Sequence, residues 1–148
     1  MQRGVRLGID VGKVRVGVAR SDPDGILATP VVTLARDNTE NTDLPTDISE
    51  ISQLVTEHEA VEVVLGLPVN LSGAEGPAAI HVRAYAEKLA DVIAPVPVVL
   101  SDERMSTVAA TRRLSDRGVK GRRQRAVVDQ AAAVEILQSW LDSQRRRR

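Results

Sequence analysis

The sequence of 148 residues has no cysteine and no phenylalanine, and it contains only one tryptophan and one tyrosine. The absence of cysteine excludes disulfide bonds, cysteine-ligated zinc sites and thiol nucleophiles, and it suits a reducing compartment. So few aromatic rings exclude nucleic-acid binding by a platform of rings on which successive bases stack. The core must instead be built from Val, Leu, Ile and Ala, whose compact side chains suit a sheet covered by helices.

Long hydrophobic segments are also missing, because no uncharged apolar run approaches the roughly 18 residues that a membrane-spanning helix requires. The chain opens on an alternating, strand-like segment at residues 5–10 and not on a signal peptide. We therefore expect a cytoplasmic protein that does not enter the membrane. Its length predicts a single domain over residues 1–142, followed by a disordered basic tail at 143–148.

The net charge is zero, but the charges are unevenly distributed along the chain. Residues 1–103 hold 8 Lys and Arg against 16 Asp and Glu, a net charge of −8, whereas residues 104–148 hold 12 against 4, a net charge of +8. A basic C-terminal segment beside a carboxylate-rich N-terminal one fits a polyanion held against metal-binding acids. Ordinary solvated surface charges are the alternative explanation.

The pattern of apolar residues predicts an α/β fold. Three strand-like segments joined by short turns predict an antiparallel meander, and two later apolar runs alternate with helices. We therefore expect a five-stranded mixed sheet, made of the three-strand meander plus two parallel strands, with helices on both faces. The predicted strands are 5–10, 14–19, 27–34, 61–65 and 96–100, and the predicted helices are one that begins at Asp47 and three at 77–92, 106–114 and 126–142.

Two details of the predicted helices can be compared directly with a structure. Asp47 and Glu50 have the spacing of a capping box, so we expect Asp47 to cap the first helix. In the helix at 77–92, the expected inner face is marked by Ile80, Ala84 and either Leu89 or Ala90.

Acidic residues stand at positions where an α/β sheet commonly places a functional site. Asp10 ends the first strand and points away from the apolar side chains of that strand. Asp102 and Glu103 follow the last strand, and only one of them can readily enter a common site because neighbours in an extended segment point oppositely. Asp129 is aligned with an apolar stripe of the last helix, where a buried carboxylate is costly unless it is paired or metal-bound.

Each acid alone has an ordinary explanation, as a turn residue, a surface charge or a partner of the helix dipole. Together, Asp10, Glu103 and Asp129 supply hard oxygen ligands without His or Cys, a set that suits Mg²⁺ or Mn²⁺. One or two such ions activate water and stabilise the leaving oxygen in phosphodiester hydrolysis. The three acids together therefore favour a metal-dependent nuclease.

Four blocks of sequence, in order and over almost the whole chain, resemble the YqgF/RuvX family. The resemblance implies a ribonuclease H-like fold, shared with Holliday-junction resolvases, and a cytoplasmic nuclease that trims the 5′ end of pre-16S rRNA. It places Asp10, Glu103 and Asp129 on the acidic active-site positions and Arg104 on the accompanying basic position. The blocks are Arg6-Leu7-Gly8-Ile9-Asp10-Val11-Gly12 with Arg15-Val16-Gly17-Val18-Ala19; Gly66-Leu67-Pro68 with Leu71-Ser72-Gly73; Asp102-Glu103-Arg104 with Ser106-Thr107; and Asp129-Gln130-Ala131-Ala132-Ala133 with Ile136-Leu137-Gln138 and Leu141.

Basic residues near these acids are candidates for phosphate binding. Lys13 and Arg15 flank the first turn, and a basic loop lies next to Asp129 in the sequence. Such side chains bind a nucleic-acid backbone without sequence preference, although as solvated charges they need no function. The candidates of the basic loop are Lys120, Arg122, Arg123 and Arg125.

Three functions remain open at this point. The first is a metal-dependent nuclease that acts on pre-rRNA, and the second is a resolvase that cuts branched DNA. The third is a non-catalytic, RNA-binding ribosome assembly factor. A resolvase cuts two strands symmetrically and is expected to be a two-fold dimer, whereas the sequence leaves both monomer and homodimer open.

Overall fold

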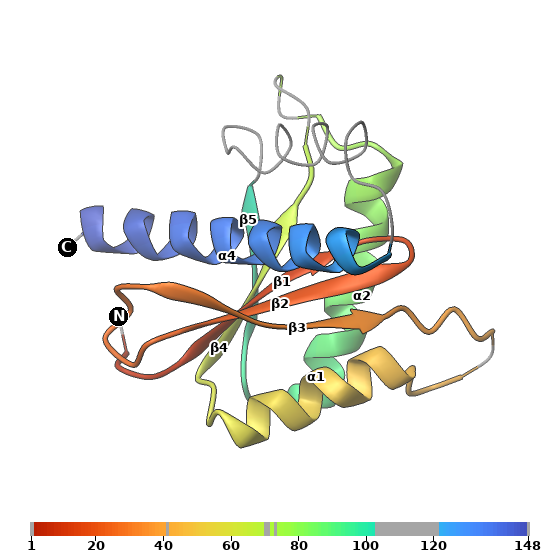
Figure 1. The fold of residues 1–148 in the computed structure, drawn as a ribbon, viewed down its shortest axis with the longest axis horizontal. Coiled ribbons are helices and arrows are strands. Elements are labelled where there is room, and N and C mark those ends of the chain that lie inside the picture. The colour runs from red at the N-terminus through yellow and green to blue at the C-terminus, as the bar shows by residue number, and fades with distance from the viewer. Residues whose placement is uncertain (1, 41, 70–71, 73, 103–121, 148) are drawn as a thin grey trace.

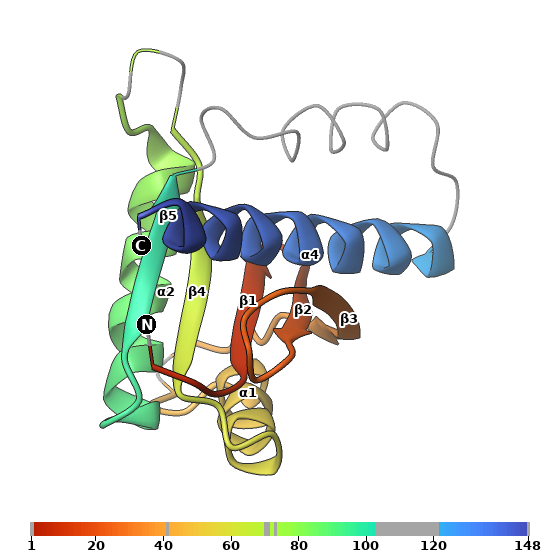
Figure 2. The same ribbon diagram turned by 90° about the vertical axis from the view of Figure 1, so that its left-hand side faces the viewer.

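A five-stranded sheet lies at the centre of the molecule, with helix α4 (Arg122–Arg146) across one face and helices α1 (Thr46–Glu57) and α2 (Pro77–Ile93) on the other (Figures 1 and 2). The structure is a computed structural model that describes residues 2–40, 42–69, 72, 74–102 and 122–147, with only the backbone described at 122–127. Over these residues, no helix is both long and apolar enough to cross a membrane.

The sheet has the topology that the sequence predicts. Its strand order is β3-β2-β1-β4-β5. The first three strands pair antiparallel as a meander, and β4 and β5 continue the sheet beyond β1 in parallel pairs. The strands are β1 (Arg6–Val11), β2 (Arg15–Ser21), β3 (Ala28–Ala35), β4 (Glu62–Leu67) and β5 (Val98–Asp102).

Alternation along β1 divides its side chains between the two faces of the sheet. Leu7, Ile9 and Val11 belong to the apolar core shared with α1 and α2. Gly8 and Asp10 therefore face α4, as the sequence predicts for Asp10. The apolar stripe of α4 is buried on that side, since Ala132, Ala133, Ile136, Leu137 and Leu141 are all nearly inaccessible to solvent.

The predicted cap of α1 is wrong, and so are two of the residues predicted for the inner face of α2, whereas Leu89 is buried as predicted. The residue before α1 is Pro45, and no side chain caps this helix; the Asp47 carboxylate lies in the core and accepts a hydrogen bond from the Tyr85 hydroxyl at 2.8 Å. In α2, Ile80 is 65% exposed, and Ala84 is exposed too. The Tyr85 ring and hydroxyl contact buried groups of the core, so the side of α2 that carries Tyr85 faces inward and Ile80 does not. The buried residues of α2 are Ala79, Val82, Tyr85, Ala86, Leu89 and Ile93.

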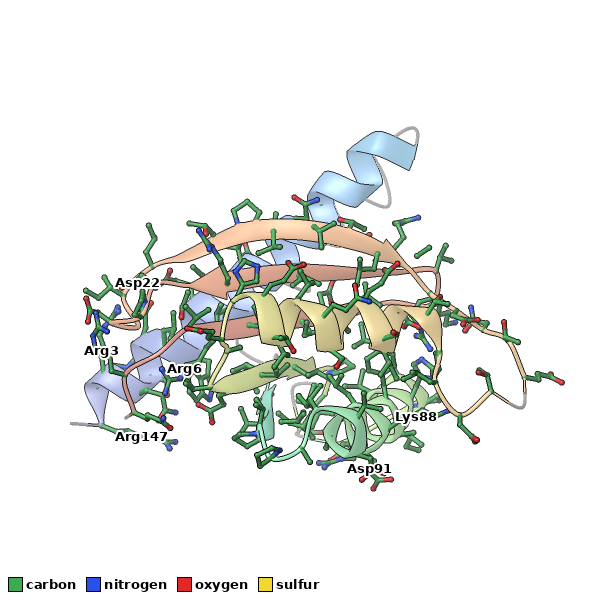
Figure 3. All side chains as sticks on the ribbon, turned by 90° about the horizontal axis from the view of Figure 1, so that it is seen from below. Arg3, Arg6, Asp22, Lys88, Asp91 and Arg147 are labelled. Atoms are coloured by element: carbon green, nitrogen blue, oxygen red, sulfur yellow. The ribbon has the colours of Figure 1, made fainter. Side chains whose placement is uncertain are left out.

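Helix α4 is longer at both ends than the predicted 126–142. Residues 143–146, which we expected to begin a disordered tail, continue the helix, because Arg145 Nη1 donates to the carbonyl oxygens of Gly25 at 2.9 Å and Ile26 at 3.0 Å. Both chain ends lie at the end of the molecule opposite the β1–β2 connection (Figure 1). Figure 3 shows Arg147 there together with Arg3 and Arg6.

Two glycines let α4 approach the sheet unusually closely. A Cβ atom added to Gly8 would lie 2.6 Å from the Leu137 Cβ atom and 3.0 Å from the Ala133 carbonyl oxygen. A Cβ atom added to Gly17 would lie 2.1 Å from the Asp129 carbonyl oxygen. Any side chain at either position would push the helix away, because backbone atoms cannot rotate aside as a flexible side chain can.

We predict that Gly17→Ala destabilises the protein by roughly 2 to 3 kcal/mol, because the added methyl group overlaps the α4 backbone. Urea unfolding measures this change in the free energy of unfolding. The matched control is Gly76→Ala, since a Cβ atom there meets nothing within 4 Å, and it should cost less than about 1 kcal/mol. Equal losses in the two variants would contradict the close approach.

Candidate active site

Asp10 is buried, with 3% of its surface exposed, at the carboxyl end of β1. Its partner on β2 is Gly17, and residues that pair directly across two strands share a face of the sheet about 5 Å apart. The position of a Gly17 Cβ atom points at the backbone of Asp129 in α4. The Asp10 side chain therefore leaves the sheet beside the turn of α4 that carries Asp129, so the structure brings together two of the three predicted acids.

Arg15 completes this group as a positive charge. Its Nε atom donates to Asp129 Oδ2 at 2.7 Å, and about a quarter of each side chain is exposed. The β1–β2 connection is tight, since the Gly12 amide donates to the Arg15 carbonyl oxygen at 2.9 Å and leaves Lys13 and Val14 at the tip. Arg15, which we predicted to bind phosphate, thus neutralises the helix acid in the structure.

The ends of β4 and β5 lie beside Asp10 at the same edge of the sheet. Ile9 pairs with Leu65, so Asp10 and Gly66 follow side by side, and Gly66 pairs with Ser101 of β5. Gly66 contributes no side chain, so β4 leaves the space between Asp10 and Ser101 open on the α4 face. Successive strands lie about 4.8 Å apart, which places β5 about 10 Å from β1.

The register also distinguishes Asp102 from the acids on the α4 face. Asp102 pairs with Leu67, whose side chain packs in the core on the α1 and α2 side of the sheet. Residues in register share a face, so Asp102 is exposed on the face opposite to Asp10. Asp102 therefore does not join Asp10 and Asp129.

Several predicted site residues lie outside the part of the chain that the structure describes. Glu103, Arg104 and Lys120 are among them, and so are the side chains of Arg122, Arg123 and Arg125. Within the described residues, no group of three His, Cys, Asp or Glu side chains forms a metal-ligand cluster. The acids that could hold a metal there are Asp10 and Asp129, whose oxygens are the ligand type that Mg²⁺ and Mn²⁺ prefer.

Sequence reasoning missed a buried ionic network that holds the β1–β2 connection on the α1 and α2 side of the sheet. Arg36 Nη1 donates to the Gly12 carbonyl oxygen at 2.7 Å and contacts His81 Nε2 at 2.9 Å. Arg36 Nε lies 3.4 Å from Asp47 Oδ2, and the guanidinium carbon lies 4.9 Å from the centre of the Tyr85 ring. The network connects the β1–β2 connection to α1 through Asp47 and to α2 through His81 and Tyr85. No hydrophobic period marks Arg36, and the position of Asp47 indicated a helix cap, so the sequence carries no signal for this pair.

The network changes the titration of two of its members. Burial, followed by the hydrogen bond to Asp47, raises the pKa of the Tyr85 hydroxyl, so this group stays protonated. Partial burial, and then the positive charges of Arg36 and Lys13, lower the pKa of His81 below its usual 6.5. An arginine only donates hydrogen bonds, so His81 Nε2 is the acceptor and the proton of the neutral ring resides on Nδ1.

The sequence matches a known protein family over almost its whole length. The model of the RuvX family, described as a Holliday junction resolvase, matches residues 4–143. The chain belongs to the RuvX family. Several relatives have the provisional name pre-16S rRNA nuclease. The one from Rhodococcus erythropolis is 56% identical to this chain, over 97% of this chain and 81% of the relative. The relative from Streptomyces avermitilis is 57% identical, over 98% and 90%, and that from Frankia casuarinae is 59% identical, over 95% and 68%.

Solved structures place this RuvX chain in a known fold. Thermus thermophilus RuvC in complex with a Holliday junction substrate superposes with a TM-score of 0.59 at 15% identity, over 96% of each chain. A second structure of T. thermophilus RuvC gives a TM-score of 0.51 at 12% identity, over 95% of this chain and 96% of RuvC. At such low identity the likeness establishes the fold alone, and it confirms the predicted ribonuclease H-like architecture.

We predict that His81 titrates below pH 6.5 and is therefore neutral at pH 7. Lys13→Gln removes one of the positive charges that disfavour the imidazolium, so it should raise the pKa of His81 toward 6.5. The matched control is Lys88→Gln, the same charge change farther along α2. NMR titration of the imidazole, assigned with His81→Gln, measures the pKa, and an equal shift in both lysine variants would refute the local effect.

Proposed function

We propose that this RuvX protein is a metal-dependent nuclease that hydrolyses phosphodiester bonds at the 5′ end of pre-16S rRNA, in the cytoplasm. The observation that carries the proposal is that the buried Asp10 pairs with Gly17, the residue against which the Asp129 turn of α4 packs. Membership of the RuvX family and the names of the relatives support a nuclease that acts on this RNA.

The donor set fits a divalent cation. A carboxylate as buried as Asp10 is costly to keep charged unless positive charge or hydrogen bonds compensate it. We assign Asp10, Asp129 and Glu103 as the residues that would hold Mg²⁺ or Mn²⁺, with the side-chain-free Gly66 leaving room between β1 and β5. When bound, such ions supply an activated water and neutralise charge on the scissile phosphate.

Basic side chains of the chain position the substrate backbone in this proposal. Lys13, at the tip of the β1–β2 connection, binds a phosphate close to Asp10. Arg15 neutralises Asp129, and when Asp129 holds a cation instead, the Arg15 guanidinium would be available to a phosphate oxygen. The remaining proposed phosphate ligands are Arg104, Lys120, Arg122, Arg123 and Arg125.

A second candidate function is resolution of branched DNA, which the description of the RuvX family favours. The same acids would perform the same hydrolysis, but symmetric cutting requires a two-fold dimer. Sedimentation as a monomer at high concentration, without binding to a four-way DNA junction, would count against resolution. A non-catalytic assembly factor would instead retain rRNA processing in cells when Asp129→Asn is introduced, and lose it when the Lys120 to Arg125 charges are removed.

We predict that Asp10→Asn lowers cleavage of an RNA with the 5′ precursor extension by at least about 100-fold, because a neutral amide binds a divalent cation poorly. EDTA should abolish cleavage by the wild type, and Mg²⁺ or Mn²⁺ should restore it. Rates of product formation on denaturing gels measure both effects.

The matched control for this experiment is Asp102→Asn, which makes the same chemical change at the same edge of the sheet but on the opposite face. Its rate should stay within about threefold of the wild type. Cleavage that is indifferent to both EDTA and Asp10→Asn would show that the metal-dependent mechanism is wrong.

We also predict that Arg15→Gln tightens the binding of Mn²⁺ to the protein without nucleic acid, by roughly threefold to tenfold, because Asp129 no longer has an arginine partner to exchange. Isothermal titration calorimetry measures the affinity. Arg20→Gln is the control, since it removes an equal charge from the far end of β2. Unchanged or weaker Mn²⁺ binding by Arg15→Gln alone would contradict competition for Asp129.

A further inference from the structure

A pocket of about 770 Å³ lies at the end of β1 on the side of the sheet away from α4. Its walls include the apolar side chains of Val11, Pro68 and Val82, and it is open between the β1–β2 connection and the start of α2. In Figure 1, these two segments lie close together at the end of the molecule away from the chain termini. The volume is within the range of small-molecule sites, and neither metal binding nor hydrolysis uses this space.

The pocket lies at the same end of β1 as Asp10, on the opposite face of the sheet. Val11, which forms part of its wall, follows Asp10 in β1, and the two side chains point to opposite faces of the sheet. Gly12 and Lys13 line the pocket as well and form the connection around which a substrate strand would pass from one face to the other. A substrate strand that followed this connection with one phosphate at Asp10 would bring its neighbouring nucleotide to the mouth of the pocket.

The polar groups of the pocket suit a phosphate and a base. None of its described lining residues is acidic, and Lys13 forms no ion pair with any described carboxylate. Asn38 lines it too, and its amide nitrogen donates to the Lys13 carbonyl oxygen at 3.3 Å. His81 adds a neutral ring with a proton on Nδ1, a donor that does not add to the charge.

The buried network links two sides of the pocket to one another. Arg36 binds the Gly12 carbonyl oxygen on one side of the opening and His81 on the other. The Arg36 side chain is only 8% exposed, and its partner Asp47 is fully buried. Two walls are thus fixed to one another through a group that has little freedom to move.

We propose that this pocket binds one unpaired nucleotide of the RNA substrate, next to the phosphodiester at Asp10, with its base against Val11, Pro68 and Val82 and its phosphate at Lys13. The inference rests on the proposed nuclease function. Apolar walls take the part that aromatic rings play elsewhere, which suits a chain with one tryptophan and one tyrosine. A base enters such a pocket only when it is unstacked and unpaired, so the pocket selects a single strand over a duplex or the arms of a DNA junction.

The test introduces a negative charge at Ala78, an exposed residue that lines the pocket at the start of α2. Ala78→Glu obstructs the pocket and repels a phosphate there, whereas the control Ala84→Glu makes the same change on an exposed part of the same helix that does not line the pocket. Both are made in the Asp10→Asn background, so that RNA is bound but not cut. The probe is a fluorescent single-stranded RNA of about ten nucleotides, alone or annealed to its complement, in EDTA.

Fluorescence anisotropy should show single-stranded RNA bound at least about tenfold more weakly by Ala78→Glu than by Ala84→Glu, with the duplex affected equally by both. Equal affinities of the two variants for the single strand would overturn the pocket proposal. If Ala78→Glu weakens binding of the duplex as much as binding of the single strand, relative to Ala84→Glu, the choice of an unpaired nucleotide is wrong.

Cleavage assays with the Asp10 background restored separate this inference from the proposed function. If the enzyme is active and its KM for RNA is the same in Ala78→Glu and Ala84→Glu, the nuclease proposal is supported and the pocket proposal is contradicted. If the protein cuts no RNA but Ala78→Glu selectively weakens single-strand binding, the pocket proposal is supported and the nuclease proposal is contradicted.

Discussion

The close contact between α4 and the sheet, permitted by Gly8 and Gly17, is the constraint on which the proposed site depends. Asp129 is carried by a helix, so its distance from Asp10 is set by how closely that helix packs on β1 and β2. The absence of side chains at the two glycines brings the Asp129 backbone against β2 and its carboxylate onto Arg15. A larger residue at either glycine would separate the acids without altering them.

The end of β1 serves the two faces of the sheet in different ways. On the α4 face it presents the buried Asp10 side chain, and on the other face it presents Val11, which lines an apolar pocket. The buried Arg36, paired with Asp47, holds the β1–β2 connection through its hydrogen bond to the Gly12 carbonyl oxygen. Such a pair contributes little net stability, because desolvation offsets its attraction, but removing one partner is costly. The pair thus keeps the proposed substrate path in one shape.

Much of the site could be predicted because it follows local periodicity. Alternation in β1 gave the face of Asp10, and the apolar stripe of α4 showed that Asp129 lies on the buried side of that helix. In α2, Leu89 is buried as predicted, but Ile80 and Ala84 were wrongly placed on the inner face because they follow a helical period as well as the buried residues do. A helical period locates a stripe, but two overlapping stripes are distinguished only by what packs against them.

The sequence by itself determined the order of the strands along the chain, their antiparallel and parallel character and the positions of the acids, since short turns and period-two or 3.6-residue patterns act within a few residues. The tertiary structure alone decided that Arg15 pairs with Asp129, that Arg36 pairs with Asp47, and that α4 continues through Arg146. These outcomes depend on distances between segments far apart in the chain. Side-chain charge and hydropathy carry no information about such distances until the sheet and the helices have packed.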